Sequence, residues 1–237
     1  MELDKAWLLA LDLSTQQGVL VLDGPGGTFH REIAGDSRVS HLFPEAGEIM
    51  SNARIGPGDI GLIGVGRGPG SFTGVRVAVT AAKIVAAVLD IPLVAPDTLM
   101  VTAAGTEEAE KPVFAALDAR RGEVYYALYR MEDGYPAAIT EPCVAPPRAA
   151  AASLSSWMDM EGTGVIGVGD GIEAYPDVWP EGMEALGRSG PGPAGLTQMC
   201  RLSGERGELC DPVMLVPLYL RRPDASVRYG SKRGDPC

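Results

Sequence analysis

The feature that most constrains this chain is a glycine-rich segment between an apolar strand and a long apolar helix. Residues 66–74 read Gly-Arg-Gly-Pro-Gly-Ser-Phe-Thr-Gly; a strand is predicted before them at residues 60–65, and a helix at about residues 71–89. Glycines let the backbone turn sharply and let several N–H groups of a helix start converge on one point. This unit of strand, loop and helix therefore predicts either an anion site or a tightly packed turn.

The spacing of the loop favours the packed turn. It lacks the Gly-Lys-Ser/Thr ending of the Walker phosphate loop and the acidic ribose partner of the dinucleotide fingerprint. In the structural interpretation, Ser71 or Thr73 caps the helix while the glycines permit close packing.

The helix after the loop is apolar around almost its whole circumference. Between Val75 and Leu89 only Arg76, Thr80 and Lys83 interrupt the apolar run. A helix that is apolar on all sides tends to be buried on all sides, whereas one sheet of a small lobe covers only one face. The pattern favours a partner on the second face, and the many alanines would let another helix approach closely. Burial between the sheet and a neighbouring helix is the alternative.

Elsewhere the sequence predicts two hairpins and a division into two lobes. Apolar runs at residues 7–13, 18–23 and 28–33 predict three strands, and helical spacing predicts a helix at 41–54 with Ser40 as its cap. Further runs at residues 113–118 and 123–129 predict a second hairpin after a charged link at 106–111. We expect a first lobe at residues 1–105 and a second, divergent lobe at 106–237, with the option that the C-terminal segment returns to the first lobe.

The charge of the chain restricts what it can bind. A net charge of -11 and a pI near 4.7 disfavour direct binding of nucleic acid, which depends on Lys and Arg contacts to phosphate. If RNA is involved, a partner must hold it. One basic stretch near the C-terminus is interpreted as a solvated tail, with contact to RNA or an acidic partner as the alternative; it contains Arg221, Arg222, Arg228, Lys232 and Arg233.

The N-terminal residues predict a cytoplasmic protein without a membrane segment. Their apolar run is short, follows two acidic residues and is broken by Asp12, which fits neither a signal peptide nor a membrane span. The cysteines are widely spaced, form no CxxC pair and have only His30 and His41 to help them, so we expect reduced thiols rather than a zinc site or disulfides. These cysteines are Cys143, Cys200, Cys210 and Cys237.

Two polar clusters could carry chemistry. Asp12, Ser14 and Thr15 follow the first strand, where a carboxylate and two hydroxyls could hold magnesium and nucleotide phosphates. In actin-like and sugar-kinase-like ATPases a glycine commonly follows this Asp, but here Leu13 does. Leu13 in place of this glycine weakens the interpretation as a nucleotide site. The alternative is that Asp12 caps a tight turn.

The second cluster lies at the second hairpin. Asp118 and Glu123 could act as paired carboxylates, but Arg120 and Arg121 between them would keep both ionised. That favours a salt-bridged turn or a partner contact over a proton shuttle, which needs a raised pKa. No nucleophile or catalytic residue is assigned.

Four segments resemble the TsaB (YeaZ) family, and they cover the N-terminal half and the C-terminal end of the chain. The run Gly-Arg-Gly-Pro-Gly-Ser-Phe-Thr-Gly-Val-Arg is highly specific, whereas residues 135–210 carry no recognisable motif. The resemblance implies an α/β, two-lobed, actin-like, Hsp70-like or sugar-kinase-like (ASKHA) fold, in which each lobe is a mixed sheet with flanking helices. The four segments are residues 9–15, 66–76, 116–125 and 217–221.

The resemblance also implies a role. TsaB looks like a non-catalytic relative of the catalytic subunit TsaD, with which it works together with the small ATPase TsaE. TsaD transfers threonylcarbamoyl from its adenylate to the adenosine next to the anticodon of tRNA, so tRNA would be reached only through the complex. TsaD has a His-x-x-x-His metal pair, and the corresponding segment 37–44 contains His41 without a mate. No metal or cofactor is therefore expected.

The family's heterodimer, and its homodimer when alone, are thought to use the first-lobe helices. Two rivals remain open: an ATP-dependent enzyme of the sugar-kinase-like class and a glycoprotease-like peptidase. By position, the resemblance makes these residues candidates for the partner surface: His41, Arg67, Gly68, Pro69, Gly70, Ser71, Phe72, Thr73, Gly74, Arg76, Ala81 and Lys83.

Overall fold

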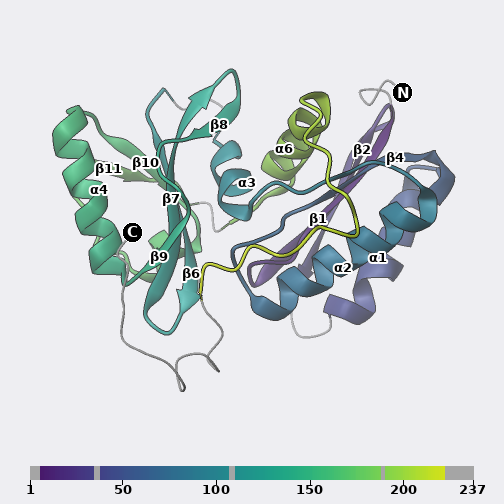
Figure 1. Cartoon of the computed structure of the whole chain (residues 1–237), viewed down its shortest axis with the longest axis horizontal. Coiled ribbons are helices and arrows are strands. Elements are labelled where there is room, and N and C mark those ends of the chain that lie inside the picture. The colour runs from purple at the N-terminus through teal and green to yellow at the C-terminus, as the bar shows by residue number, and fades with distance from the viewer. Residues whose placement is uncertain (1–5, 35–37, 107–109, 188–189, 222–237) are drawn as a thin grey trace.

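The chain forms two lobes that lie side by side, each built on a mixed β-sheet with helices on its faces (Figure 1). The computed structural model describes residues 6–34, 38–106, 110–187 and 190–221. The predicted pair of mixed sheets with flanking helices is confirmed.

The first sheet has the strand order β3-β2-β1-β4-β5. β2 is antiparallel to both of its neighbours, β1 and β3, whereas β4 runs parallel to β1 and β5 runs parallel to β4. The predicted hairpin, the third strand and the strand before the glycine loop are confirmed. The strands are β1 Trp7–Asp12, β2 Gln17–Gly24, β3 Gly27–Ala34, β4 Ile60–Val65 and β5 Leu93–Val94.

Helices cover both faces of this sheet. α1 and α2 pack on one face, where the side chains of Leu9 and Leu11 lie, and α3 and α6 pack on the other, against Leu8 and Ala10. The alternation follows from the two-residue period of a strand. The helices are α1 Arg38–Asn52, α2 Phe72–Leu89, α3 Thr98–Ala104 and α6 Pro193–Glu205, and a short 3-10 helix spans Pro57–Asp59.

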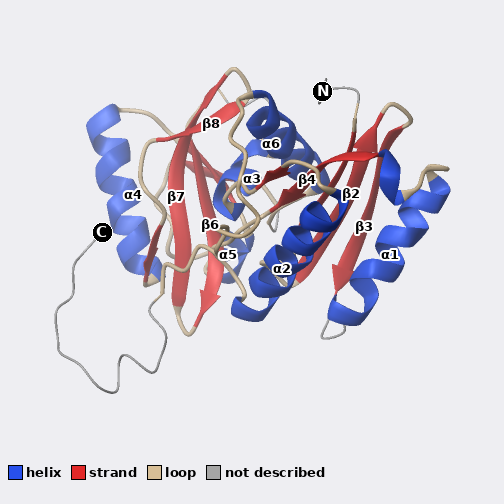
Figure 2. Ribbon diagram, turned by 45° about the vertical axis from the view of Figure 1, so that its right-hand side comes forward, coloured by secondary structure: helices blue, strands red, loops and turns tan. Residues whose placement is uncertain are grey.

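The second sheet repeats the topology of the first. Its order β8-β7-β6-β10-β11 has the same sequence of antiparallel and parallel pairs, and β9 pairs with β7 beside β8. α4 packs on its outer face, and α3 lies between the two sheets (Figure 2). The elements are β6 Val113–Arg120, β7 Glu123–Glu132, β8 Tyr135–Ala138, β9 Cys143–Ala145, α4 Pro147–Glu161, β10 Val165–Val168, α5 Asp170–Ala174 and β11 Met183–Ala185.

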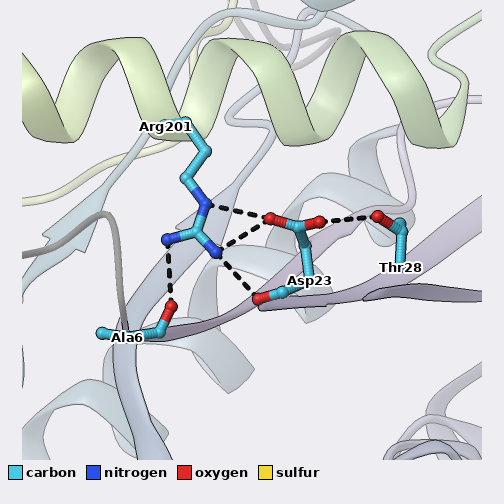
Figure 3. Close-up of polar contacts among 4 residues, drawn as sticks. All are labelled: Ala6, Asp23, Thr28 and Arg201. Atoms are coloured by element: carbon cyan, nitrogen blue, oxygen red, sulfur yellow. Dashed lines mark hydrogen bonds and ion pairs between the residues drawn. The ribbon is translucent and has the colours of Figure 1, made fainter. Parts of the chain in front are cut away.

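After β11 the chain returns to the first lobe through α6. Leu196 and Met199 of this helix are fully buried against the first sheet. Arg201 fixes the helix to the sheet, because its Nε and Nη2 lie 3.0 and 2.8 Å from Oδ2 of Asp23, and its Nη1 donates to the carbonyl of Ala6 at 3.0 Å (Figure 3). The other carboxylate oxygen of Asp23 accepts a 2.6 Å bond from Thr28.

Three local expectations need correction or limits. α1 begins at Arg38, so Ser40 lies inside the helix and is not its cap. Cys200 and Cys210 are free thiols as expected, but Cys143 is disulfide-bonded, so the expectation was wrong there; distance along the sequence does not fix which thiols meet in space. Cys237 and the basic residues from Arg222 onward lie outside the described residues.

α2 is long and apolar enough to cross a membrane by length and composition, and 39% of it is buried. It packs on the first sheet through Val75, Ala78, Val79 and Ala82, which are almost completely buried. We therefore assign it as a core helix with one buried and one exposed face.

Candidate functional site

The exposed face of α2 carries large apolar side chains. Phe72, Ile84 and Val88 are 53%, 54% and 76% exposed. Ser71 caps the start of the helix, because its hydroxyl accepts a 3.3 Å bond from the N–H of Gly74, so the predicted cap at Ser71 is confirmed. Apolar side chains grouped on a surface are typical of a protein interface.

A segment from the end of the chain lies alongside α2. We call residues 209–221 the C-terminal strap. Lys83 donates from Nζ to the carbonyls of Leu215 and Val213 at 2.8 and 3.3 Å, which places the strap against the helix. The strap has exposed apolar side chains of its own: Leu209, Val213, Met214, Val216 and Tyr219.

An aromatic and cationic cluster joins the strap to the start of α2. The rings of Phe72 and Tyr219 are 5.3 Å apart between centroids, and the guanidinium of Arg76 lies 4.1 Å from the Phe72 centroid. Nε of Arg76 also donates to the hydroxyl of Tyr219 at 3.0 Å. We define the α2 surface as Phe72, Arg76, Ile84 and Val88 together with Tyr219.

The glycine loop packs directly on the turn of the first hairpin. A Cβ on Gly66 would lie 1.8 Å from Oδ2 of Asp12, and one on Gly70 would lie 2.5 Å from the carbonyl oxygen of Ser14. The N–H of Ser71 donates to that same carbonyl at 2.7 Å. The loop therefore has the close-packed geometry that was the alternative to an anion site; Gly68 and Pro69 are buried, whereas Arg67 and Thr73 are exposed.

Asp12 is enclosed by this packing. It is fully buried, its Oδ1 accepts from the N–H of Ser14 at 2.8 Å, and its Oδ2 accepts from the Thr98 hydroxyl at 2.8 Å. Burial raises its pKa, which these hydrogen bonds partly counteract. Thr15 uses its hydroxyl on the carbonyl of Gln17 at 2.8 Å. Asp12 thus caps a tight turn, and both its oxygens are engaged by protein donors.

Two partner-surface candidates on the helices differ in position. His41 is exposed on α1. Ala81 is only 8% exposed and belongs to the core between α2 and the first sheet, so it does not lie on the outer surface. The sequence could not show this, because an all-apolar helix gives no periodic signal for which side faces the sheet.

The carboxylates of the second hairpin have separate partners. Arg120 pairs with Asp118 at 3.1 Å, and Glu123 pairs with Arg221 at the end of the strap. This is the arrangement of a salt-bridged turn. The N–H of Asp118 donates at 2.8 Å to Oδ1 of Asp170, the first residue of α5.

Asp170 has the most perturbed carboxylate at the cleft. Its pKa is raised to about 6, first by burial and then by the neighbouring carboxylates of Asp118 and Glu173; the Asp118 N–H and Arg120 act in the opposite direction. The sequence shows an Asp after the strand that became β10. It could not show that this Asp is buried, because burial depends on how α5 packs against β6, and no local sequence pattern predicts that packing.

A cleft of about 930 Å³ separates the two lobes. Its charged lining residues are four acids and one base, so the described walls carry an excess of negative charge. Such walls repel phosphate groups, which disfavours a nucleotide in this cleft. These charged residues are Glu32, Asp118, Arg120, Asp170 and Glu173.

Within the described ranges, no group of three or more His, Cys, Asp or Glu side chains is arranged to hold a metal ion. The α2 surface is therefore the candidate functional site.

The duplicated sheet topology, with a cleft between the lobes, defines a protein of the actin-like, Hsp70-like and sugar-kinase-like class. The family described as "TsaD: tRNA N6-adenosine threonylcarbamoyltransferase" matches residues 21–159. The chain belongs to the TsaB (YeaZ) family within this group, as the resemblance implied.

Similarity to individual relatives extends over most of the chain. It is 32% identical to the tRNA threonylcarbamoyladenosine biosynthesis protein TsaB of Escherichia coli K12 over 183 residues, or 73% of this chain and 75% of that protein. Identity to the TsaB of Bacillus subtilis 168 is 30% over 196 residues, or 79% and 81%. The solved structure of YeaZ from Pseudomonas aeruginosa superposes with a TM-score of 0.80 at 27% identity, covering 91% of this chain and all of that one.

Proposed function

We propose that this chain acts in the formation of threonylcarbamoyladenosine on tRNA as the non-catalytic partner of a TsaD-type catalytic subunit. The observation that carries the proposal is its similarity to the TsaB proteins of Escherichia coli and Bacillus subtilis, whose names state a role in this biosynthesis. A TsaE-type ATPase completes the assembly, and tRNA is reached only through the complex. This work takes place in the cytoplasm.

The geometry of the first lobe supports a non-catalytic role. Asp12, which would have to face a magnesium ion and phosphates in an ATP-dependent enzyme, is buried with both oxygens engaged. The acidic cleft also disfavours a nucleotide. His41, where a metal pair would start in TsaD, is exposed on α1, and it belongs to no metal-binding group of His, Cys, Asp or Glu among the described residues.

The α2 surface supports the partner role. Fully burying an apolar side chain of the size of Phe72, Ile84 or Val88 contributes about 1.5 to 3 kcal/mol. Aromatic and arginine side chains are also the types that contribute most at interfaces, and Phe72, Arg76 and Tyr219 form one cluster here. In the absence of the catalytic subunit, the same surface serves a homodimer.

The test is reconstitution of tRNA threonylcarbamoylation with the TsaD-type and TsaE-type proteins of the same organism, the adenylate donor and tRNA. Val88→Arg places a charge on the α2 surface at a position that is 76% exposed, so the fold should tolerate it. Met160→Arg is the matched control, because Met160 is 74% exposed but lies on α4 of the second lobe. Ala81→Arg is unsuitable, since a charge in the core would unfold the lobe.

We expect Val88→Arg to weaken binding of the catalytic subunit by about tenfold or more, which corresponds to a loss of about 1.4 kcal/mol in binding free energy. The rate of tRNA modification should fall by a similar factor. Met160→Arg should behave as wild type. Modification that proceeds equally well without the chain would refute the partner role. Equal effects of the two variants would refute the location of the surface on α2.

A further inference from the structure

The C-terminal strap is the last described segment, and it crosses from the first lobe to the second. In Figure 1 it is the yellow segment that leaves α6, runs along α2 and ends at the foot of β6. It begins at the edge of the first sheet, where the N–H of Cys210 donates to the carbonyl of Leu93 at 2.8 Å and Leu209 bridges Val94. It ends at Arg221, beside the turn between β6 and β7.

Its contacts to the first lobe are numerous and specific. Leu215 is buried in the first-lobe core, and its carbonyl accepts from Lys83 at 2.8 Å. The N–H of Leu218 donates to the carbonyl of Arg67 in the glycine loop at 2.8 Å. At the next residue, Tyr219, the ring lies against Phe72 and the hydroxyl accepts from Arg76. This half of the strap is therefore fixed to the α2 surface.

Its contacts to the second lobe are fewer. Leu220 packs at the margin of the core formed by α3 and the second sheet. The guanidinium of Arg221 pairs with the carboxylate of Glu123, and its Nη2 also donates to the carbonyl of Arg120 at 3.4 Å. Arg221 thus makes the described polar contacts that join the strap to the second hairpin.

The turn that Arg221 contacts has an unusual backbone. Arg120, Arg121 and Gly122 have φ angles of 61°, 59° and 75°, and two of these left-handed residues are not glycine. Such residues carry conformational strain and persist only where the surroundings hold them. Asp118 holds the turn from inside by accepting from the Arg120 N–H at 2.9 Å, and Arg221 holds it from outside.

Asp118 and Arg120 also line the cleft, so the same turn connects the strap to the cleft wall. We propose that the strap is a latch that couples the α2 surface to the cleft-lining turn at residues 118–123, with the Arg221–Glu123 ion pair as its closing contact. A change at Tyr219 then reaches the cleft through three residues of chain. The latch is a property of the isolated chain and does not depend on the function proposed above.

Hydrogen exchange of the full chain, followed by mass spectrometry, tests the latch. Arg221→Ala should speed exchange of the amides in residues 118–123 by up to about fivefold, the range expected for one partly exposed ion pair. Tyr219→Ala, at the other end of the latch, should speed exchange both in the strap and in residues 118–123. Lys111→Ala is the control, because it removes an exposed second-lobe ion pair with Glu184 that does not reach the strap.

A charge swap provides a check that does not rely on deletion. Arg221→Glu combined with Glu123→Arg should restore the slow exchange of residues 118–123 that either single change abolishes. The latch is overturned if Tyr219→Ala alters the strap alone, if Arg221→Ala leaves residues 118–123 at the wild-type rate, or if exchange rises equally in β1 and β4, which would mean a general loss of stability.

Discussion

Replacing Asp170 by Asn should stabilise the protein at neutral pH. The ordinary pKa of an Asp is near 3.8, and burial raises that of Asp170 to about 6. The folded state therefore binds the proton of Asp170 more tightly than the unfolded state does, and the ionised side chain destabilises the fold. An amide has no charge to bury, and its oxygen can still accept the 2.8 Å bond from the N–H of Asp118.

The magnitude follows from the difference between the two pKa values. A difference of about 2 corresponds to about 3 kcal/mol of unfolding free energy, and the partial solvent access of Asp170 reduces the expected effect to about 1 to 2 kcal/mol. The destabilisation is complete above pH 6. It is relieved as the pH falls from about 6 toward 4, because the folded state then takes up the proton.

Urea unfolding at pH 7.5, 6.0 and 4.5 measures this. Asp170→Asn should exceed wild type in unfolding free energy at pH 7.5, and the difference should shrink steadily toward pH 4.5. Glu48→Gln, which removes one exposed carboxylate on α1, is the control and should change the unfolding free energy by the same small amount at all three pH values. A gain that is independent of pH, or a loss at pH 7.5, would refute the assignment of a buried, destabilising charge.

Two further substitutions test the packing of the first lobe by urea or thermal unfolding. Gly70→Ala should lower the unfolding free energy by about 1 to 3 kcal/mol, because its Cβ would lie 2.5 Å from the carbonyl oxygen of Ser14. Gly47→Ala, which has open space around it, is the control and should not destabilise the protein. Equal stability of the two variants would contradict the close packing of the loop. Arg201→Ala should lower the unfolding free energy by about 2 kcal/mol, because it breaks the ion pair that anchors α6 to Asp23. Arg31→Ala removes a more exposed pair with Glu45 and should change the unfolding free energy by less than about 1 kcal/mol. A loss at Arg201 no larger than the loss at Arg31 would contradict the anchoring role.

The elements with a strong local pattern could be predicted from the sequence. The two hairpins and α2 combine apolar runs with turn or cap residues, and both signals act within a few positions. The orientation of α2 could not be predicted, because its apolar residues surround the helix and only contact with the sheet buries Ala81 while leaving Val88 exposed. The strap has no local pattern either. Its position depends on Lys83 and Arg76 meeting residues more than a hundred positions away.

The shared topology of the lobes explains why their two hairpin carboxylates differ. Asp12 and Asp118 lie at equivalent strands, β1 and β6, and the loop after the equivalent strands β4 and β10 packs beside each. In the first lobe that loop is rich in glycine, and its backbone packs so closely on Asp12 that the carboxylate is buried and does not line the cleft. In the second lobe the loop supplies Asp170, whose carboxylate adds a negative charge where a phosphate would need hydrogen-bond donors. The two loops therefore disfavour a phosphate group in different ways, the first by close packing and the second by charge.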